Sequence, residues 1–301
     1  EEGRAEDTNA LTYTSDTTAA LPKGVVIEHG YMLRNYDYVA KFAPLFPTDN
    51  YLSFISPAWA TEQLFGIVGW VKTGMIINFP ESSDTVQENI REIAPNFLLY
   101  PSRQWESIIS MIRARMLDAG FLKRTCYSLA LPIGYKVANL RFAKKKINLL
   151  WRFLYFLADL AAFRPLRDRF GLLKARVTIT GGSLLGPDGI TFFHAIGVKL
   201  RSGLGMTEAA IICIHREDDI KFETVGPPVK KEVKLSEEGE IMVGGDDIFH
   251  AYYKDPEETR KKVRDGWFYT GDAGYMDGDG HMVYWDRVND LRQLAGGKKF
   301  S

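Results

Sequence analysis

The pattern of apolar and polar positions predicts short strands that alternate with helices in the first hundred residues. Short β-branched and aromatic runs indicate strands, and the longer stretches between them have helical spacing. The predicted strands are Val25–Ile27, Tyr51–Pro57, the buried run Met75–Phe79 and Asn96–Pro101; the predicted helices are Tyr31–Ala43, Ala58–Gly74 and one before Asn96. This alternation indicates an α/β fold in which helices cover a mostly parallel sheet.

The stretch from Trp105 to about Phe170 has a helical pattern almost throughout. Within it, three lysines precede the apolar segment Ile147–Phe163. The polar residues of that segment share one helix face; they are Asn148, Arg152, Tyr155 and Asp159. Two interpretations of Lys144–Phe163 remain open. It is either a peripheral contact with an anionic membrane, or a helix packed on the body beside a solvated lysine cluster.

The pattern changes again in the last third of the chain. Arg176–Thr180 and Val198–Arg201 are predicted strands, and beyond about Arg216 short strands and turns follow one another. We therefore predict a body over residues 1–215, with the helical insertion at about 105–170, and a small β-rich subdomain over residues 216–288.

Composition excludes several classes of protein. The 301 residues are 46% hydrophobic and 25% charged, as in globular proteins. The 38 basic and 38 acidic residues cancel, which argues against nucleic acid as a partner. Cys126 and Cys213 lack metal-binding spacing and predict reduced thiols. Without a signal peptide or an apolar run of about 20 residues, we expect a cytoplasmic protein, with the inner membrane face as the place of any peripheral contact.

Hydroxyl side chains gather just before Val25. They are Thr12, Thr14, Ser15, Thr17 and Thr18, and Pro22-Lys23-Gly24 follows them. Hydroxyls and backbone N–H groups can bind phosphate oxygens, and a lysine adds a point charge. No Walker sequence is present. From these residues alone, a phosphate-binding loop between two strands and a polar hairpin turn are equally good interpretations.

Four further strings follow this loop in the chain. They are Gly181-Gly182-Ser183, Gly203-Leu204-Gly205-Met206-Thr207-Glu208, Asp265–Asp272 and Trp285-Asp286-Arg287. Together with Tyr13–Gly24 they resemble, in family order, the adenylate-forming (AMP-binding) superfamily of acyl-CoA synthetases, luciferases and peptide-synthetase adenylation domains. The helical insertion is most similar to that of long-chain fatty-acid–CoA ligases. The resemblance extends from about Leu11 to the last residue, and it implies a layered αβαβα body.

The resemblance also implies roles for individual residues. Lys23, Thr207 and Glu208 would be catalytic, with Glu208 also binding Mg²⁺. Trp59 and Gly182 would border the acyl pocket, and Asn289 would be the hinge to a further domain that begins within residues 289–301. The implied nucleotide-binding residues are Thr14, Ser15, Thr17, Thr18, Lys23, Gly181, Gly182, Ser183, Gly203, Leu204, Gly205, Met206, Thr207, Asp272 and Arg287.

The implied reaction has two steps and uses ATP, Mg²⁺ and coenzyme A. A long-chain fatty acid would become an acyl-adenylate and then acyl-CoA. Asp16 and Ala19 stand where the family has glycines, and Leu204 stands where it has an aromatic residue. We expect a chain truncated at both ends relative to the family. The alternative function is an impaired fragment or pseudoenzyme that binds nucleotide or acyl chains without turnover.

Overall fold

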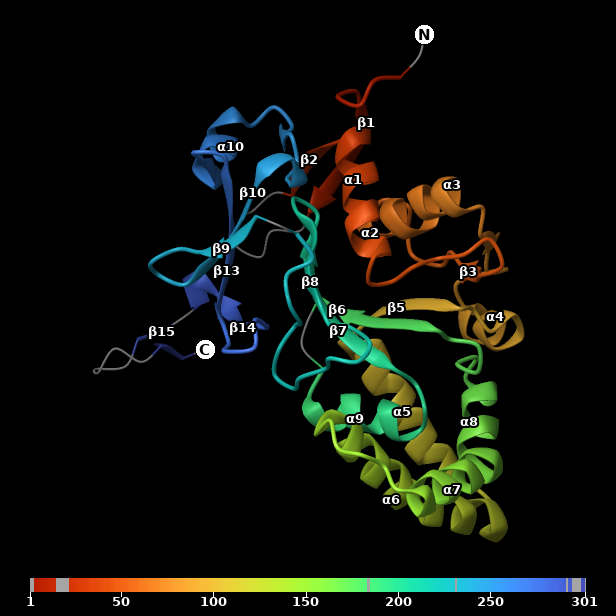
Figure 1. Ribbon diagram of the computed structural model, residues 1–301. Helices are drawn as coiled ribbons and strands as arrows, with labels where there is room; N and C mark the ends of the chain where they lie inside the picture. The colour runs from red at the N-terminus through yellow and green to blue at the C-terminus, as the bar shows by residue number, and fades with distance from the viewer. Residues whose placement is uncertain are drawn as a thin grey trace.

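The computed structural model describes residues 3–14, 22–182, 185–230 and 232–290, with the backbone of 292–293 and 299–300. Parallel strands covered by helices form the larger part, and antiparallel strands form most of the remainder (Figure 1). This arrangement confirms the predicted α/β class and the β-rich part that follows it.

The central sheet has the strand order β5-β6-β7-β8. β5 (Phe97–Pro101), β6 (Val177–Gly181) and β7 (Leu200–Met206) are parallel, and β8 (Ala210–Ile214) runs antiparallel to β7. Helices α5 (Ser102–Leu117) and α9 (Pro187–Ala195) pack against it, where Trp105 is fully buried and its Nε1–H donates to the Ile179 carbonyl at 3.2 Å. The strands are covered on both faces, so even their polar side chains Thr178, Thr180, Arg201 and Ser202 are buried.

The helices before this sheet confirm the two predicted helical segments. The first is α1 (His29–Ala40). The second is continuous but changes type: α2 (Ala60–Glu62), the π-helical η1 (Gln63–Val68) and α3 (Gly69–Thr73). It ends at Gly74, whose φ of 70° is a conformation that glycine adopts without strain. The predicted helix before Asn96 is α4 (Val86–Ile93).

Two strand predictions are corrected. Only β3 (Asn50–Leu52) forms within the strand predicted to end at Pro57. Its parallel partner is β4 (Ile76–Asn78). The prediction that Met75–Phe79 is buried is confirmed for Met75, which is 1% exposed, and wrong for Ile76 and Phe79. Ile76 is 50% exposed and Phe79 is 72% exposed. Within the described ranges β4 pairs with β3 alone, so one edge of β4 has no covering strand.

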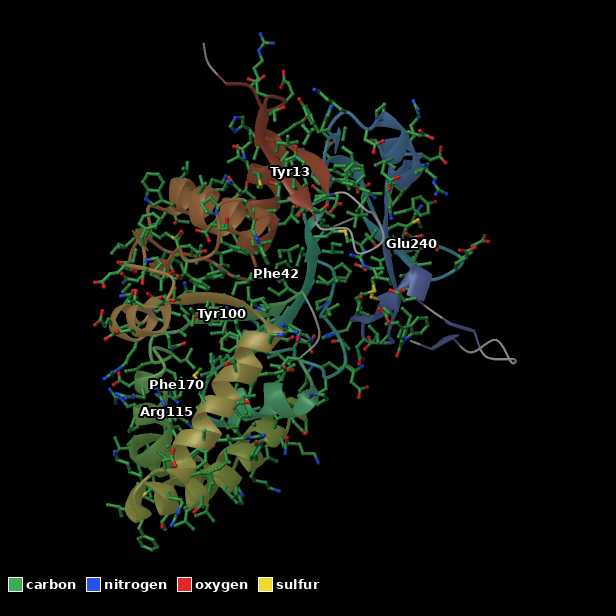
Figure 2. All side chains as sticks on the ribbon, turned by 180° about the vertical axis from the view of Figure 1, so that it is seen from behind. Tyr13, Phe42, Tyr100, Arg115, Phe170 and Glu240 are labelled. Carbon is green, nitrogen blue, oxygen red and sulfur yellow. The ribbon has the colours of Figure 1, made fainter. Side chains whose placement is uncertain are left out.

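The predicted helical region is confirmed, with breaks at residues 118–120 and 143–148. It consists of α5, α6 (Phe121–Phe142), α7 (Leu149–Ala158), the π-helical η2 (Asp159–Phe163) and α8 (Arg164–Arg169). Asn148 caps α7, since its Oδ1 accepts from the Trp151 N–H at 3.0 Å. Figure 2 labels Arg115 and Phe170 beside each other, and the guanidinium lies 5.3 Å from the ring centroid.

Antiparallel strands form two further sheets. Hairpin β1 (Thr8–Thr14) and β2 (Lys23–Glu28) pairs with β11 (Ala251–Tyr252). The second sheet contains β9 (Val233–Leu235), β10 (Glu240–Gly244), β12 (Val263–Arg264), β13 (Trp267–Met276) and β14 (Met282–Arg287). The remaining elements are η3 (Gly245–Asp247), α10 (Pro256–Lys262), η4 (Val288–Asp290), β15 (Arg292–Gln293) and β16 (Lys299–Phe300).

One hydrophobic cluster runs through both predicted parts of the chain. It includes Val25 of β2, Ile179 of β6, and Ile241 and Phe268 of the second antiparallel sheet. The pairing of β2 with β11 also joins the two predicted parts, because β2 precedes the predicted boundary at residues 215 and 216 and β11 follows it. The β-rich part is therefore packed against the hairpin, and the division of the chain at these residues stays a prediction.

Candidate functional site

A cavity of about 740 Å³ lies among the β1–β2 hairpin, β7, the start of α2, α10, β13 and the end of β14. Figure 1 shows β7 and β8 between the helices α1–α3 and the β9–β14 sheet. The cavity wall brings together residues predicted from the sequence that lie up to 273 positions apart: Thr14, Lys23, Trp59, Gly181, Gly182, Gly203, Gly205, Met206, Thr207, Glu208 and Arg287.

Glycines form one wall of the cavity. Gly181 ends β6 and Gly182 follows it, and Gly203 and Gly205 lie on β7. Gly182 has a φ of 80°, and a Cβ at this position would meet nothing within 4 Å, so its backbone borders open space. Such a surface fits a flat base lying against it. Leu204, which alternates with the two β7 glycines, packs against the hydrophobic core instead and is absent from the wall.

Lys23 meets an acidic partner that the sequence did not indicate. Its Nζ lies 2.7 Å from Oε1 of Glu258, in the first turn of α10, and both side chains are largely buried. Nζ also lies 5.6 Å from the centroid of the Tyr252 ring. The pair joins residues 235 positions apart, so no local pattern could have identified Glu258. Because Glu258 lines the same cavity, its carboxylate competes with any phosphate for Lys23.

Two tyrosines hold the Thr207–Glu208 segment in place. Tyr252 Oη donates to Glu208 Oε1 at 2.9 Å, and Tyr31 Oη donates to the Thr207 carbonyl at 2.8 Å. Burial, and then the charge of Glu208, raise the pKa of Tyr31 well above its ordinary value. The Glu208 carboxylate is thus positioned on the same cavity wall as Lys23. One carboxylate beside a phosphate site suits Mg²⁺, which takes few protein ligands and completes its shell with phosphate oxygens and water.

Asp272 and Arg287 are directly opposite each other in the pairing of β13 and β14. Arg287 Nη1 lies 3.2 Å from Asp272 Oδ1 and donates to the Thr270 carbonyl at the same distance. Burial raises the pKa of Asp272 to about 6, against the lowering effect of Arg287 and Lys262. Asp272 lies behind the wall that Arg287 forms. The pair is therefore preformed, with Arg287 toward the cavity.

Gly271 separates two cations at this end of the cavity. Its φ is 79°, and a Cβ there would lie 3.2 Å from Lys262 Nζ and 3.5 Å from Arg287 Nη1. Lys262 lines the cavity and is not among the residues predicted from the sequence. Its position at the end of α10 gives no signal of its own. Lys262 and Arg287 together make this end of the cavity favourable for an anion.

Apolar side chains line the opposite end. Trp59 is 58% exposed and forms this wall with Ile55, Leu64 and Leu99. Just behind it, Glu62 is buried and accepts hydrogen bonds from the hydroxyls of Tyr51 and Ser53, each at 2.6 Å. Burial raises the pKa of Glu62 above its usual value. The cavity thus has a charged end and an apolar end, which suits an acid with an apolar body.

Several predicted residues lie outside the described part of the chain. Ser15, Thr17, Thr18, Asp16, Ala19 and Ser183 belong to this group, and so does the side chain of Asn289. Their predicted roles stay predictions. No helix within the described ranges has the length and apolar character needed to cross a membrane.

Comparison with known proteins identifies the family. The family model described as AMP-binding enzyme matches residues 1–253, so the chain belongs to the AMP-binding enzyme family. The peroxisomal long chain acyl-CoA synthetase 7 of Arabidopsis thaliana is 28% identical over 316 residues, covering 98% of this chain and 43% of that protein. Fatty acyl-CoA synthetase B of Dictyostelium discoideum is 27% identical and covers 96% and 44%. The chain spans about half the length of the curated relatives it matches.

Solved structures show the same fold. O-succinylbenzoate coenzyme A synthetase from Bacillus subtilis, in complex with AMP, superimposes with a TM-score of 0.69 at 18% identity, over 99% of this chain and 53% of that one. A malonyl-CoA ligase bound to methylmalonyl-CoA and AMP gives 0.65 at 21% identity, over 99% and 57%. The fold is therefore that of adenylate-forming enzymes.

Proposed function

We propose that this chain carries the nucleotide- and acid-binding part of a long-chain fatty acid–CoA ligase of the AMP-forming type. The observation that supports this most strongly is the single cavity with Lys23 and Glu208 on one wall, bare glycine backbone on another and apolar side chains at its far end. ATP, Mg²⁺ and coenzyme A would be required.

In the proposed first step, a carboxylate oxygen of the acid attacks the α-phosphorus of ATP, and pyrophosphate leaves. Lys23, Thr14 and Thr207 would hold phosphate oxygens, while Asp272 and Arg287 would contact the ribose and the glycine wall the adenine. Mg²⁺, held by Glu208, would neutralise phosphate charge. In the second step the thiol of coenzyme A attacks the acyl carbon and AMP leaves. Positioning and electrostatic stabilisation would supply the catalysis, without a covalent enzyme intermediate.

The acid we propose is a long-chain fatty acid. The apolar end of the cavity near Trp59, and the names of the similar long-chain acyl-CoA synthetases, support this choice. Such acids partition into membranes, since each buried CH₂ contributes about 0.8 kcal/mol. We therefore propose a cytoplasmic protein that works at the inner face of a membrane.

A second candidate function is nucleotide or acyl-chain binding without turnover. The ion pair between Lys23 and Glu258 favours it, because this pair must open before Lys23 can reach a phosphate. The substitutions at Asp16, Ala19 and Leu204 point the same way. Both candidates use the same cavity and differ in whether the acid reacts.

Acid-dependent exchange of labelled pyrophosphate into ATP tests the first step without coenzyme A. We expect exchange with palmitate and Mg-ATP, less with octanoate, and none with malonate or o-succinylbenzoate. Lys23→Met should lower the exchange rate by at least about tenfold, since it removes a charge-assisted contact. Lys41→Met, at an exposed site on the C-terminal side of α1, is the matched control.

Asp16→Gly separates the two candidate functions. Exchange by the unaltered chain supports the ligase. Exchange by Asp16→Gly alone places the defect in the loop and supports the impaired form. Binding of labelled ATP with no exchange from either chain overturns the ligase proposal for this chain. A preference for malonate would overturn the long-chain specificity and leave the ligase chemistry intact.

A further inference from the structure

Helix α7 and η2 expose six large apolar side chains on the outside of the molecule, although Ala158 and Phe163 are buried. These side chains are between 44% and 80% exposed: Leu149, Leu150, Phe153, Phe156, Leu157 and Leu160. Two polar residues of the same helices, Tyr155 and Asp159, face inward, whereas Asn148 and Arg152 are exposed. Asp159 Oδ1 lies 2.7 Å from Arg167 Nη1, and the Tyr155 ring lies 5.2 Å from the Arg141 guanidinium. In an ordinary surface helix the large apolar side chains face the core; here six of them face outward.

Helix α6 extends this surface. Phe121, Leu122 and Leu129, on its first two turns, are 67–77% exposed. Helices α6 and α7 pack against each other at the end of the molecule farthest from the β1–β2 hairpin (Figure 1). We call the outward side of α6, α7 and η2 the insertion face. An exposed apolar surface of this kind on a folded protein indicates an interaction site.

The charge around the insertion face is strongly one-sided. Between Asp118 and Asp168 the chain has ten lysines and arginines and a single carboxylate, Asp159, although the whole chain is formally neutral. That carboxylate is already paired with Arg167. Lys144 contacts Asp219, and Lys145 and Lys146 are exposed beside it, just before α7. The surroundings of the apolar side chains therefore present positive charge.

We propose that the insertion face docks on an anionic lipid bilayer. The apolar side chains of α7 and η2 enter the boundary between headgroups and acyl chains, and the lysines at the start of α7 meet lipid phosphates. A second copy of the chain is a poorer occupant, because two faces of the same sign repel each other. The helices lie along the surface and do not cross it. The proposal gives the predicted substrate a membrane source, but docking itself does not depend on the proposed reaction.

Sedimentation with vesicles tests the proposal in the absence of ATP and acid. We expect the full chain to bind phosphatidylcholine vesicles that contain about 30 mol % phosphatidylglycerol at least about tenfold more tightly than pure phosphatidylcholine vesicles. The double variant Phe153→Glu/Phe156→Glu should lose at least about tenfold in affinity. Lys145→Gln/Lys146→Gln should lose about fivefold for each lysine removed.

The controls match these changes on other faces. Trp70→Glu/Val71→Glu replaces two exposed apolar residues of α3 and adds two negative charges, as the α7 variant does. Lys41→Gln/Lys261→Gln removes two exposed lysines away from the insertion face. Circular dichroism and thermal melting should be unchanged in all four variants, since every altered side chain is at least partly exposed.

Equal binding to neutral and anionic vesicles, or loss of binding in the α3 variant but not the α7 variant, overturns the proposal. Conversion of a dimer to a monomer by the α7 changes, without vesicle binding, assigns the face to a second copy. Pyrophosphate exchange with detergent-dispersed palmitate needs no membrane. Its absence therefore contradicts the proposed reaction and says nothing against docking.

Discussion

Individual residues of the site differ in how far the sequence could reveal them. Lys23, Glu208 and Asp272 stand in strings that resemble a family, and the cavity has Lys23 and Glu208 on its wall and Asp272 just behind it. Glu258 and Lys262 stand in no such string. Both lie on α10 and reach the cavity because β11 pairs with β2 and carries α10 toward the hairpin. A contact between residues 23 and 258 leaves no trace in local spacing.

Removal of the charge of Glu258 should strengthen nucleotide binding. In Glu258→Gln, Lys23 no longer has to leave a carboxylate before it meets a phosphate, and a partly buried ion pair of this kind contributes about 1 kcal/mol. We expect the Kd for Mg-ATP to fall about fivefold by isothermal calorimetry. Glu257→Gln, at the exposed neighbouring position, is the control and should change nothing. An unchanged Kd in Glu258→Gln would mean that Lys23 does not contact the phosphates.

The buried carboxylate of Asp272 should make stability depend on pH. Its pKa of about 6 in the folded chain exceeds the ordinary value of about 4, so ionisation of Asp272 opposes folding. This cost is absent below about pH 4, grows between about pH 4 and 6, and then stays constant at roughly 2–3 kcal/mol. Asp272→Asn removes it. In urea unfolding the variant's gain over the unaltered chain should be about 1 kcal/mol larger at about pH 8 than at about pH 5. The same gain in the free energy of unfolding at both pH values would contradict the raised pKa of Asp272.

At the scale of elements, periodicity predicted helices and strands well but not which face of each is covered. The apolar run of β4 and the apolar side of α7 both resemble core segments in the sequence, yet Ile76 and Phe79 at β4 and six large side chains of α7 and η2 are exposed. For β4 the reason is its position beside β3 alone among the described strands. For α7 the reason is that Asp159 and Tyr155 find partners on α8 and α6 beneath the helix.

The attachment of α6 to the body depends on one small residue. A Cβ at Gly134 would lie 2.6 Å from the Ala195 carbonyl oxygen of α9 and 2.9 Å from Phe163 Cζ. Gly134→Ala should therefore push α6 away from α9 and lower the free energy of unfolding by about 1–3 kcal/mol, as measured with urea. Gly120→Ala, where a Cβ would meet nothing within 4 Å, should stay within about 0.5 kcal/mol of the unaltered chain. A similarly small change in Gly134→Ala would mean that α6 and α9 are not closely packed.

At the scale of the whole molecule, the formal net charge is zero although positive and negative charges are unevenly distributed along the chain. The 38 basic and 38 acidic residues balance, yet the excess of positive charge lies in the helical insertion and the compensating negative charge lies elsewhere. A formal net charge of zero disfavours nucleic acid as a partner of the chain as a whole. Attraction to a surface depends instead on the local field within a Debye length.

This charge separation predicts a strong effect of salt. Binding of the chain to anionic vesicles should weaken at least about tenfold between about 50 mM and about 500 mM sodium chloride, because the Debye length shortens from more than 10 Å to a few Å. Binding to neutral vesicles, which depends on apolar insertion, should not weaken. Vesicle sedimentation at a series of salt concentrations measures both. Salt-independent binding to the anionic vesicles would show that the lysines do not contact the lipid.

The sequence by itself determined the alternation of strands and helices, the family strings and the residue types able to bind a nucleotide. These properties depend on residues close together in the chain, through side-chain period, backbone freedom and the chemistry of neighbouring groups. Only the tertiary structure decided that Glu258 pairs with Lys23, that Asp272 is buried against Arg287 and that the apolar side of α7 faces outward. Burial and charge pairing depend on segments that meet only when the chain folds, so spacing along the sequence does not contain them.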